Sequence, residues 1–183
     1  MSRAAIFIDG AYLDHVLKDE LGGAKVDYSR LARKMAGDLD LLRVYYYHCL
    51  PYQSNPPTPE EQERFSKAQK FFKALERLPR FEVRMGKLEY RGTTADGERI
   101  FIQKRVDLAL GVDLVRLAVS GSITHALLIA GDSDLLPAIE AAKDTGVLIH
   151  LFHGAHYHDD LWHAADERTE ITKEFVSALL RSH

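Results

Sequence analysis

The sequence predicts an α/β fold in which a mostly parallel central sheet lies between two layers of helices. Two continuous apolar runs, 4–8 and 126–130, have the length and composition of strands that are buried on both faces, and the second lies within a strand expected at 123–130. A third segment, 105–120, is apolar at helical spacing, with Val106, Leu110 and Leu114 on one face. Strands that alternate with such helices are typical of a doubly wound sheet in a three-layer α/β/α sandwich.

The remaining elements are expected from their boundaries. Asp27 suits the N-cap of a helix that Gly37 ends, and Pro59 with two glutamates suits the start of another helix. Asp96-Gly97 predicts a hairpin turn. In chain order, the expected elements are a helix at 11–18, a helix at 27–35, a strand at 41–50, a proline-rich loop at 51–59, a helix at 59–78, short strands at 81–85 and 87–90, a helix at 134–143, a strand at 147–152 and a last helix from about 159 to 177–180.

Composition narrows the class of protein. A length of 183 residues favours one domain, residues 1–183, and a hydrophobic fraction of 46% suffices for a packed core. The net charge of -3 weighs against avid, non-specific binding of nucleic acid but allows a local basic stripe. Cys49 is alone, which excludes a disulfide framework and indicates a small buried side chain. Neither a signal peptide nor an apolar run of roughly 20 residues is present, so we expect a cytoplasmic protein with no membrane partner.

Acidic residues follow the two apolar runs that are predicted to form buried strands. The first apolar run ends at Asp9, and the second is followed by Asp132 and Asp134. Ligands of open α/β sheets bind beyond the carboxyl ends of the strands, where these side chains are expected. Asp107 lies in the first turn of the 105–120 helix and can reach the same edge. Carboxylates held close together repel and require a cation, and oxygen ligands suit Mg²⁺ or Mn²⁺.

A structural role is the alternative for each aspartate taken singly. Aspartate at a helix start is a common N-cap, and Asp107 can interact favourably with a helix dipole. Asp132 and Asp134, however, put two acids where one cap suffices. Asp113 is a further candidate, although six helical residues turn its side chain by about 120° from that of Asp107.

Three segments resemble a known family in order and spacing. They are Phe7-Ile8-Asp9-Gly10, Lys104-Arg105-Val106-Asp107 and Gly131-Asp132-Ser133-Asp134, and together they resemble the NYN domain, in the LabA-like branch of the PIN-like nuclease superfamily. The resemblance extends from Ile6 to about Phe152, and 161–166 is similar to the closing helix of the family. Gly-Asp-Ser-Asp after a buried strand is its most specific element.

The resemblance implies a PIN-like sandwich and metal-dependent hydrolysis of RNA phosphodiesters. Asp9, Asp107, Asp132 and Asp134 match the acidic pocket of the family, as catalytic residues and as ligands of Mg²⁺ or Mn²⁺. A bound metal withdraws charge from the phosphate, generates hydroxide from water and stabilises the leaving oxygen. Many members carry asparagine shortly after the Asp-Gly, whereas this chain has Ala11-Tyr12-Leu13.

Two other functions stay open. A catalytically weak or inactive domain would bind RNA or a protein partner. Tyr12 and the acidic net charge favour this hypothesis. A phosphohydrolase for a small metabolite would also use strand-end aspartates, but that class needs a second aspartate where this chain has Ala11. The sequence does not reveal whether the chain forms a homo-oligomer.

Candidate substrate contacts adjoin the acidic set. Lys104 and Arg105 precede Asp107, and Tyr12 and Ser133 lie beside the strand-end acids. A stripe of basic residues on the 59–78 helix is better interpreted as a solvated face; its members are Arg64, Lys67, Lys70 and Lys73. Five histidines match no known zinc spacing and are interpreted as incidental: His150, His153, His156, His158 and His163.

Overall fold

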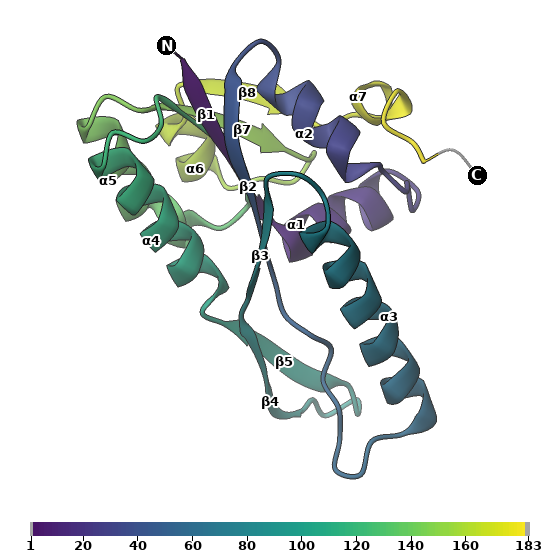
Figure 1. Ribbon diagram of the computed structural model, residues 1–183. Coiled ribbons are helices and arrows are strands. Elements are labelled where there is room, and N and C mark those ends of the chain that lie inside the picture. The colour runs from purple at the N-terminus through teal and green to yellow at the C-terminus, as the bar shows by residue number, and fades with distance from the viewer. Residues whose placement is uncertain (1, 182–183) are drawn as a thin grey trace.

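Six strands, all parallel, form the central sheet of the computed structural model, which describes residues 2–181 (Figure 1). Their order is β3-β2-β1-β6-β7-β8, so β1 lies in the middle. The strands are β1 (Arg3–Asp9), β2 (Asp40–His48), β3 (Phe81–Met85), β6 (His125–Ile129), β7 (Leu148–His153) and β8 (Glu167–Glu170). The predicted α/β sandwich with a parallel sheet is therefore confirmed.

Alternate residues of the inner strands enter two separate cores. In β1, Ile6 and Ile8 pack on one face, while Ala5 and Phe7 pack on the other. This division follows from the two-residue period of a strand and explains why the inner strands read as continuous apolar runs.

Helices cover both faces and complete the three layers. The Ile6 face is covered by α1 (Gly10–His15), a π-helical turn η1 (Val16–Glu20), α2 (Tyr28–Ala36), α3 (Pro59–Glu76) and α7 (Lys173–Ser177). The Phe7 face is covered by α4 (Val106–Val119), α5 (Leu136–Asp144) and α6 (Asp159–Ala164). Within residues 2–181, no helix has the length and apolar character needed to cross a membrane.

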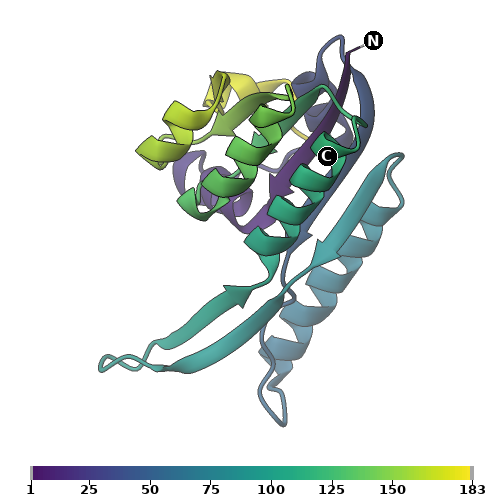
Figure 2. The ribbon, with the colours of Figure 1, turned by 90° about the vertical axis from the view of Figure 1, so that its left-hand side faces the viewer.

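An arm projects from the carboxyl edge of the sheet (Figures 1 and 2). It consists of the antiparallel hairpin β4 (Lys87–Thr93) and β5 (Arg99–Lys104), the loop 51–58 and the first turns of α3. Tyr52, Tyr90 and Phe101 form an aromatic cluster there, with ring centroids 5.2 to 5.9 Å apart. Glu61 joins the parts of the arm, because it accepts hydrogen bonds from Ser54 and pairs with Arg99 at 2.9 Å.

The predicted last helix is wrong. The segment instead forms α6, the edge strand β8 and α7 in succession. The sequence of β8, Glu167-Arg168-Thr169-Glu170, contains no apolar residue, because β8 is an edge strand whose side chains stay largely outside the core. Thr169 and Glu167 contact His150 of β7 through their polar side chains. The helix expected at 134–143 also begins with a short 3₁₀ turn, η2 (Ser133–Leu135).

The chain order places a topological switch point beside β1. From β1 the chain passes to β2 and β3 on one side, and it later returns to β6, β7 and β8 on the other side. The segment after β1 leads to a helix on one face of the sheet, and the segment after β6 leads to a helix on the other face. Crevices of this kind are the usual ligand sites of open α/β sheets.

Candidate functional site

Asp9 and Asp132 border the switch point. Ile8 pairs with Ile129 in the register between β1 and β6, so Asp9 ends one strand and Asp132 follows the end of its neighbour. Asp9 is 9% exposed. Burial raises the pKa of its carboxyl, the amide of Tyr12 opposes this change, and the nearby charge of Asp132 adds to it. These two aspartates thus lie within electrostatic reach of each other.

Asp107 joins them from the first turn of α4. Partial burial raises the pKa of its carboxyl to about 6, and the charges of Asp9, Asp132 and Asp134 contribute to the rise. The charges of the other three predicted acids therefore reach Asp107 at one edge of the sheet. The reason is geometric, since α4 begins at the carboxyl edge, directly after the arm.

Two of the four aspartates also cap helices, so the capping role and the clustering coexist. The carboxylate of Asp9 accepts a hydrogen bond from the amide of Tyr12 at 3.1 Å, at the start of α1. Asp132 accepts one from the amide of Asp134 at 2.9 Å, at the start of η2. Each bond engages one carboxylate oxygen and fixes the direction of the other.

The donor set fits a hydrated hard cation. Within residues 2–181, none of the four carboxylates forms an ion pair with a basic side chain, and Lys104 pairs with Glu89 instead, at 3.9 Å. In the same range, no three of these carboxylates bring oxygens within 4.8 Å of one another. A hydrated Mg²⁺ does not require a closer group, because it retains several waters and takes only one or two carboxylates directly. Repulsion without a basic partner and oxygen-only donors both agree with that ion.

The acids border two cavities of different character. A cavity of 390 Å³ is lined by Asp9, Tyr12, Gly131, Asp132, Ser133 and His158. A larger one of 920 Å³ runs between α4 and α5, where Asp107 and Asp134 meet apolar residues such as Leu108 and Val112. Ser133 and Tyr12 thus line the same cavity as Asp9 and Asp132.

Tyr12 is part of a fixed connection between the first helix and the loop after β7. Its hydroxyl donates to the carbonyl of His156 at 2.9 Å and accepts from the amide of Gly154 at 3.0 Å. Burial raises the pKa of this phenol, so it stays neutral. The phenol therefore positions the loop, and its hydroxyl is engaged by two backbone groups.

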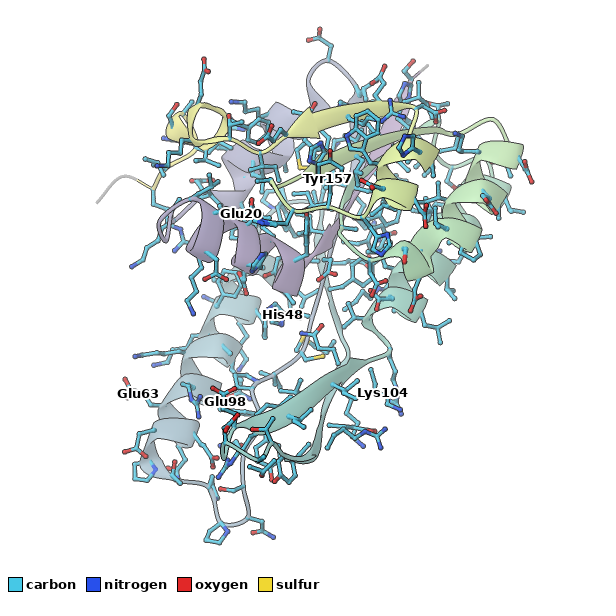
Figure 3. All side chains as sticks on the ribbon, turned by 180° about the vertical axis from the view of Figure 1, so that it is seen from behind. Glu20, His48, Glu63, Glu98, Lys104 and Tyr157 are labelled. Carbon is cyan, nitrogen blue, oxygen red and sulfur yellow. The ribbon has the colours of Figure 1, made fainter. Side chains whose placement is uncertain are left out.

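The other candidate residues, Lys104, Arg105 and Asp113, lie at the end of β5 and along α4. Lys104 ends β5, three residues before Asp107, and Figure 3 shows it where the arm joins the domain. Arg105 follows with a φ of 75° at the N-cap of α4. Asp113 is buried along α4 and engaged with Tyr47 at 2.9 Å and Arg116 at 3.1 Å. These partners give Asp113 a structural role, apart from the four acids.

Two histidines reach this edge that were not selected from the sequence. His48 ends β2, and its charge lowers the pKa of Asp9 (Figure 3). His158 lines the cavity of Asp9. The rule used for Asp9 also identifies His48, because the last residue of the strand beside β1 lies at the same edge. The sequence, however, predicts that this strand ends at residue 50, two residues too late, so His48 is not identified as a strand end from the sequence alone. Cys49 is buried, as expected.

Comparison with known proteins supports the family resemblance. A family model described as the NYN domain matches residues 3–172. A crystal structure of a protein of unknown function from Vibrio parahaemolyticus is similar with a TM-score of 0.62 and 16% identity, over 95% of each chain. At that identity the likeness concerns the fold alone. No curated protein matches.

Proposed function

We propose that this chain, which belongs to the NYN domain family of the PIN-like nuclease superfamily, is a Mg²⁺- or Mn²⁺-dependent endoribonuclease. The gathering of Asp9, Asp107, Asp132 and Asp134 at the switch point, without a basic partner among residues 2–181, carries the proposal. The Gly131–Asp134 motif further supports membership of the LabA-like branch. RNA is the proposed substrate because NYN domains are in general nucleases of this superfamily.

A bound metal would supply a water-derived nucleophile and charge stabilisation at the phosphate. The chain itself contributes the four carboxylates, of which Asp9 and Asp132 are oriented by backbone amides. Lys104 offers a cation to a neighbouring phosphate of the substrate. The small cavity of 390 Å³ beside Asp9 and Asp132 leaves room for a phosphate and its water.

The decisive experiment compares two aspartate variants. Asp132→Asn keeps the size and the capping oxygen of the side chain, so the fold should persist while RNA cleavage with Mn²⁺ falls by at least a hundredfold. Asp38→Asn is the matched control, because Asp38 is exposed in the turn before β2, at the opposite edge of the sheet. Cleavage of labelled single-stranded RNA is measured, with circular dichroism as the check on folding.

Metal binding is tested separately by thermal melting. A ligand that binds only the folded state raises its stability, so millimolar Mn²⁺ should raise the Tm of the wild type more than that of Asp132→Asn. An equal shift in both proteins would contradict the assignment of the metal to these acids.

The second candidate function is that of a binding module with the same fold. The specific observation in its favour is Tyr12, whose hydroxyl is committed to Gly154 and His156 where related domains often have an asparagine. RNA binding by the wild type, without cleavage in Mg²⁺ or Mn²⁺, would support the module and reject the enzyme.

A further inference from the structure

A second set of potential metal ligands lies outside the acidic site. His15 at the end of α1, Glu20 at the end of η1 and His156 in the loop after β7 bring one ligand atom each within 4.8 Å of one another. The oxygen Oε1 of Glu20 is 3.1 Å from Nδ1 of His156 and 3.7 Å from Nε2 of His15. Glu20 is labelled in Figure 3, at the end of η1.

The π-helical turn is what brings His15 and Glu20 together. In an α-helix, residues five apart are rotated by about 140° and face different directions. In η1 the backbone instead bonds at a spacing of five, as in the 3.1 Å hydrogen bond from the amide of Leu21 to the carbonyl of Val16. Such π-helical insertions are frequent at functional sites. The irregular turn thus has a local consequence, because it places two ligand types on one face.

Hydrogen bonds already orient two of the three ligands, His15 and Glu20. Nδ1 of His15 donates to Asp19 at 2.8 Å, which leaves the lone pair of Nε2 directed toward Glu20. A histidine whose other nitrogen donates to a carboxylate is the usual arrangement at a metal site. Glu20 in turn accepts from the amide of Ala155 at 2.6 Å through its other oxygen. His15 and Glu20 are therefore already held in place by hydrogen bonds of the kind that usually orient metal ligands.

Oε1 of Glu20 and Nδ1 of His156 lie at hydrogen-bond distance, 3.1 Å, so a metal ion would replace the proton that this pair shares. The 3.7 Å gap between His15 and Glu20 is wider than an N–H···O bond. Two ligands at about 2.0–2.1 Å from a tetrahedral Zn²⁺ would lie roughly 3.4 Å apart. Glu20 is largely buried, while His156 is exposed, so a fourth position is open to water. The loop after β7 lies so close to Glu20 that only glycine fits at position 154, since a Cβ there would lie 2.4 Å from the carboxylate of Glu20.

We propose that His15, Glu20 and His156 form a Zn²⁺ site with water as the fourth ligand. Two imidazoles, one carboxylate and an open position suit this ion, and the set lacks the all-oxygen character that Mg²⁺ prefers. Bound zinc joins the first helical segment to the loop that also carries His158, which lines the acidic cavity. The ion thereby fixes one wall of that cavity. Sequence spacing did not reveal the site, because its ligands come from two segments 136 residues apart.

Zinc binding is measured on the full, tag-free chain in competition with a chromophoric chelator. Millimolar Mg²⁺ is present throughout to occupy the acidic pocket. The wild type should bind one equivalent of Zn²⁺, and His15→Ala and His156→Ala should each weaken the affinity at least tenfold. Asp19→Ala should weaken it by about 10-fold or more, because this variant removes the acceptor of the bond from His15. Co²⁺ in place of Zn²⁺ should give the visible absorption of a tetrahedral site.

Two controls separate this site from other ligands in the chain. His163→Ala removes an exposed histidine outside the cluster, and Asp132→Asn alters the acidic pocket; both should bind zinc as the wild type does. Absence of zinc binding by the wild type would overturn the proposal. Undiminished binding by the folded His15→Ala and His156→Ala variants, or a loss confined to Asp132→Asn, would also overturn it. None of these outcomes depends on nuclease activity, so the proposed function can fail independently.

Discussion

At the scale of single residues, Asp107 combines a cost in stability with a role in the proposed site. Its pKa of about 6 means that the folded state disfavours the ionised carboxyl, chiefly through partial burial. In metal-free protein at pH 7.5, Asp107→Asn should therefore stabilise the fold by roughly 1 kcal/mol, after allowance for the solvent screening of a half-buried group. For a chain of this length the Tm should rise by about 2–4 °C.

Melting curves in the presence of a chelator measure this effect, and cleavage assays accompany them. The same variant should lose RNA cleavage, so stability and activity change in opposite directions. Asp38→Asn is again the control and should change neither property. A lower Tm for metal-free Asp107→Asn would mean that its carboxylate is favourable to the fold, which would contradict the electrostatic description of the site.

Several of the residue assignments could be predicted because the chemistry follows from strand ends. Asp9 and Asp132 were selected by the apolar runs before them, and a parallel sheet necessarily brings such ends to one edge. Asp113 shows the limit of this reasoning. Its acidity is visible in the sequence, whereas its hydrogen bond to Tyr47 and ion pair with Arg84 depend on packing between α4 and the sheet.

At the scale of elements, Glu61 determines how the arm responds to acid. Hydrogen bonds from Ser54, from Thr58 and from Arg99 lower the pKa of its carboxyl to about 2. The folded pKa is below the usual 4.5, so the ionised carboxyl contributes stability above pH 4.5, and this contribution is lost as the pH falls toward 2.

Hydrogen exchange tests the prediction at the amides that Glu61 accepts. Glu61→Gln should lower the protection factors of the Ser54 and Thr58 amides several-fold at pH 6. The difference from the wild type should shrink at pH 3 and below. Glu60→Gln is the matched control, because Glu60 is an exposed neighbour on the same helix. A difference that stays constant from pH 6 to pH 2 would show that ionisation of Glu61 has no part in it.

Two lysines on different elements distinguish the possible paths of RNA. Lys104 ends β5 beside α4, and its Nζ lies 3.9 Å from a carboxylate oxygen of Glu89, a long ion pair. Lys70 is exposed on α3. Lys104→Ala should weaken RNA binding and reduce the slope of log K against log salt by about 0.7, as expected for one phosphate contact with a single strand. Lys70→Ala should leave the slope unchanged.

Affinity for a labelled RNA is measured across a salt series, in the Asp132→Asn background to prevent cleavage. The reverse result, a reduced slope for Lys70→Ala and an unchanged slope for Lys104→Ala, would move the RNA to α3 and reject the phosphate contact proposed for Lys104.

Elements were predictable where a periodic core face marks them. The spacing of Val106, Leu110 and Leu114 defines α4, and all three are buried. Strand β8 carries no such pattern, because it is an edge strand whose side chains stay mostly outside the core. Arg168 instead lies over the ring of Trp162 at 4.3 Å, a contact that only the folded chain creates. Local sequence therefore predicts buried elements better than edge elements.

At the scale of the whole molecule, the arm and the acidic site share one edge of the sheet (Figure 1). Sequence reasoning predicted the strand 87–90 and the turn at Asp96-Gly97, but the direction of the arm depends on long-range packing. Tyr52, from the loop after β2, lies against Phe101 of β5 with ring centroids 5.2 Å apart. An RNA bound at the acids, as proposed, would have an exposed aromatic surface at the same edge of the sheet.

Nucleobases stack on aromatic side chains with a gain of about 1–3 kcal/mol per base. Phe101 is 38% exposed and adjoins Tyr90, so one base of a single strand can pack there. Phe101→Ala should therefore weaken binding of single-stranded RNA roughly 5- to 150-fold by that range of energies, again in the Asp132→Asn background. The salt slope should stay unchanged, because no phosphate contact is removed.

Val119→Ala is the control for this last prediction. Val119 is an exposed apolar residue at the far end of α4 from Asp107, and it lines the cavity between α4 and α5. Fluorescence anisotropy with one RNA at two salt concentrations compares the variants. If Val119→Ala weakens binding and Phe101→Ala does not, the RNA runs along α4 and α5 from the acids. In that case the arm has another role, because its aromatic cluster would lie off the substrate path.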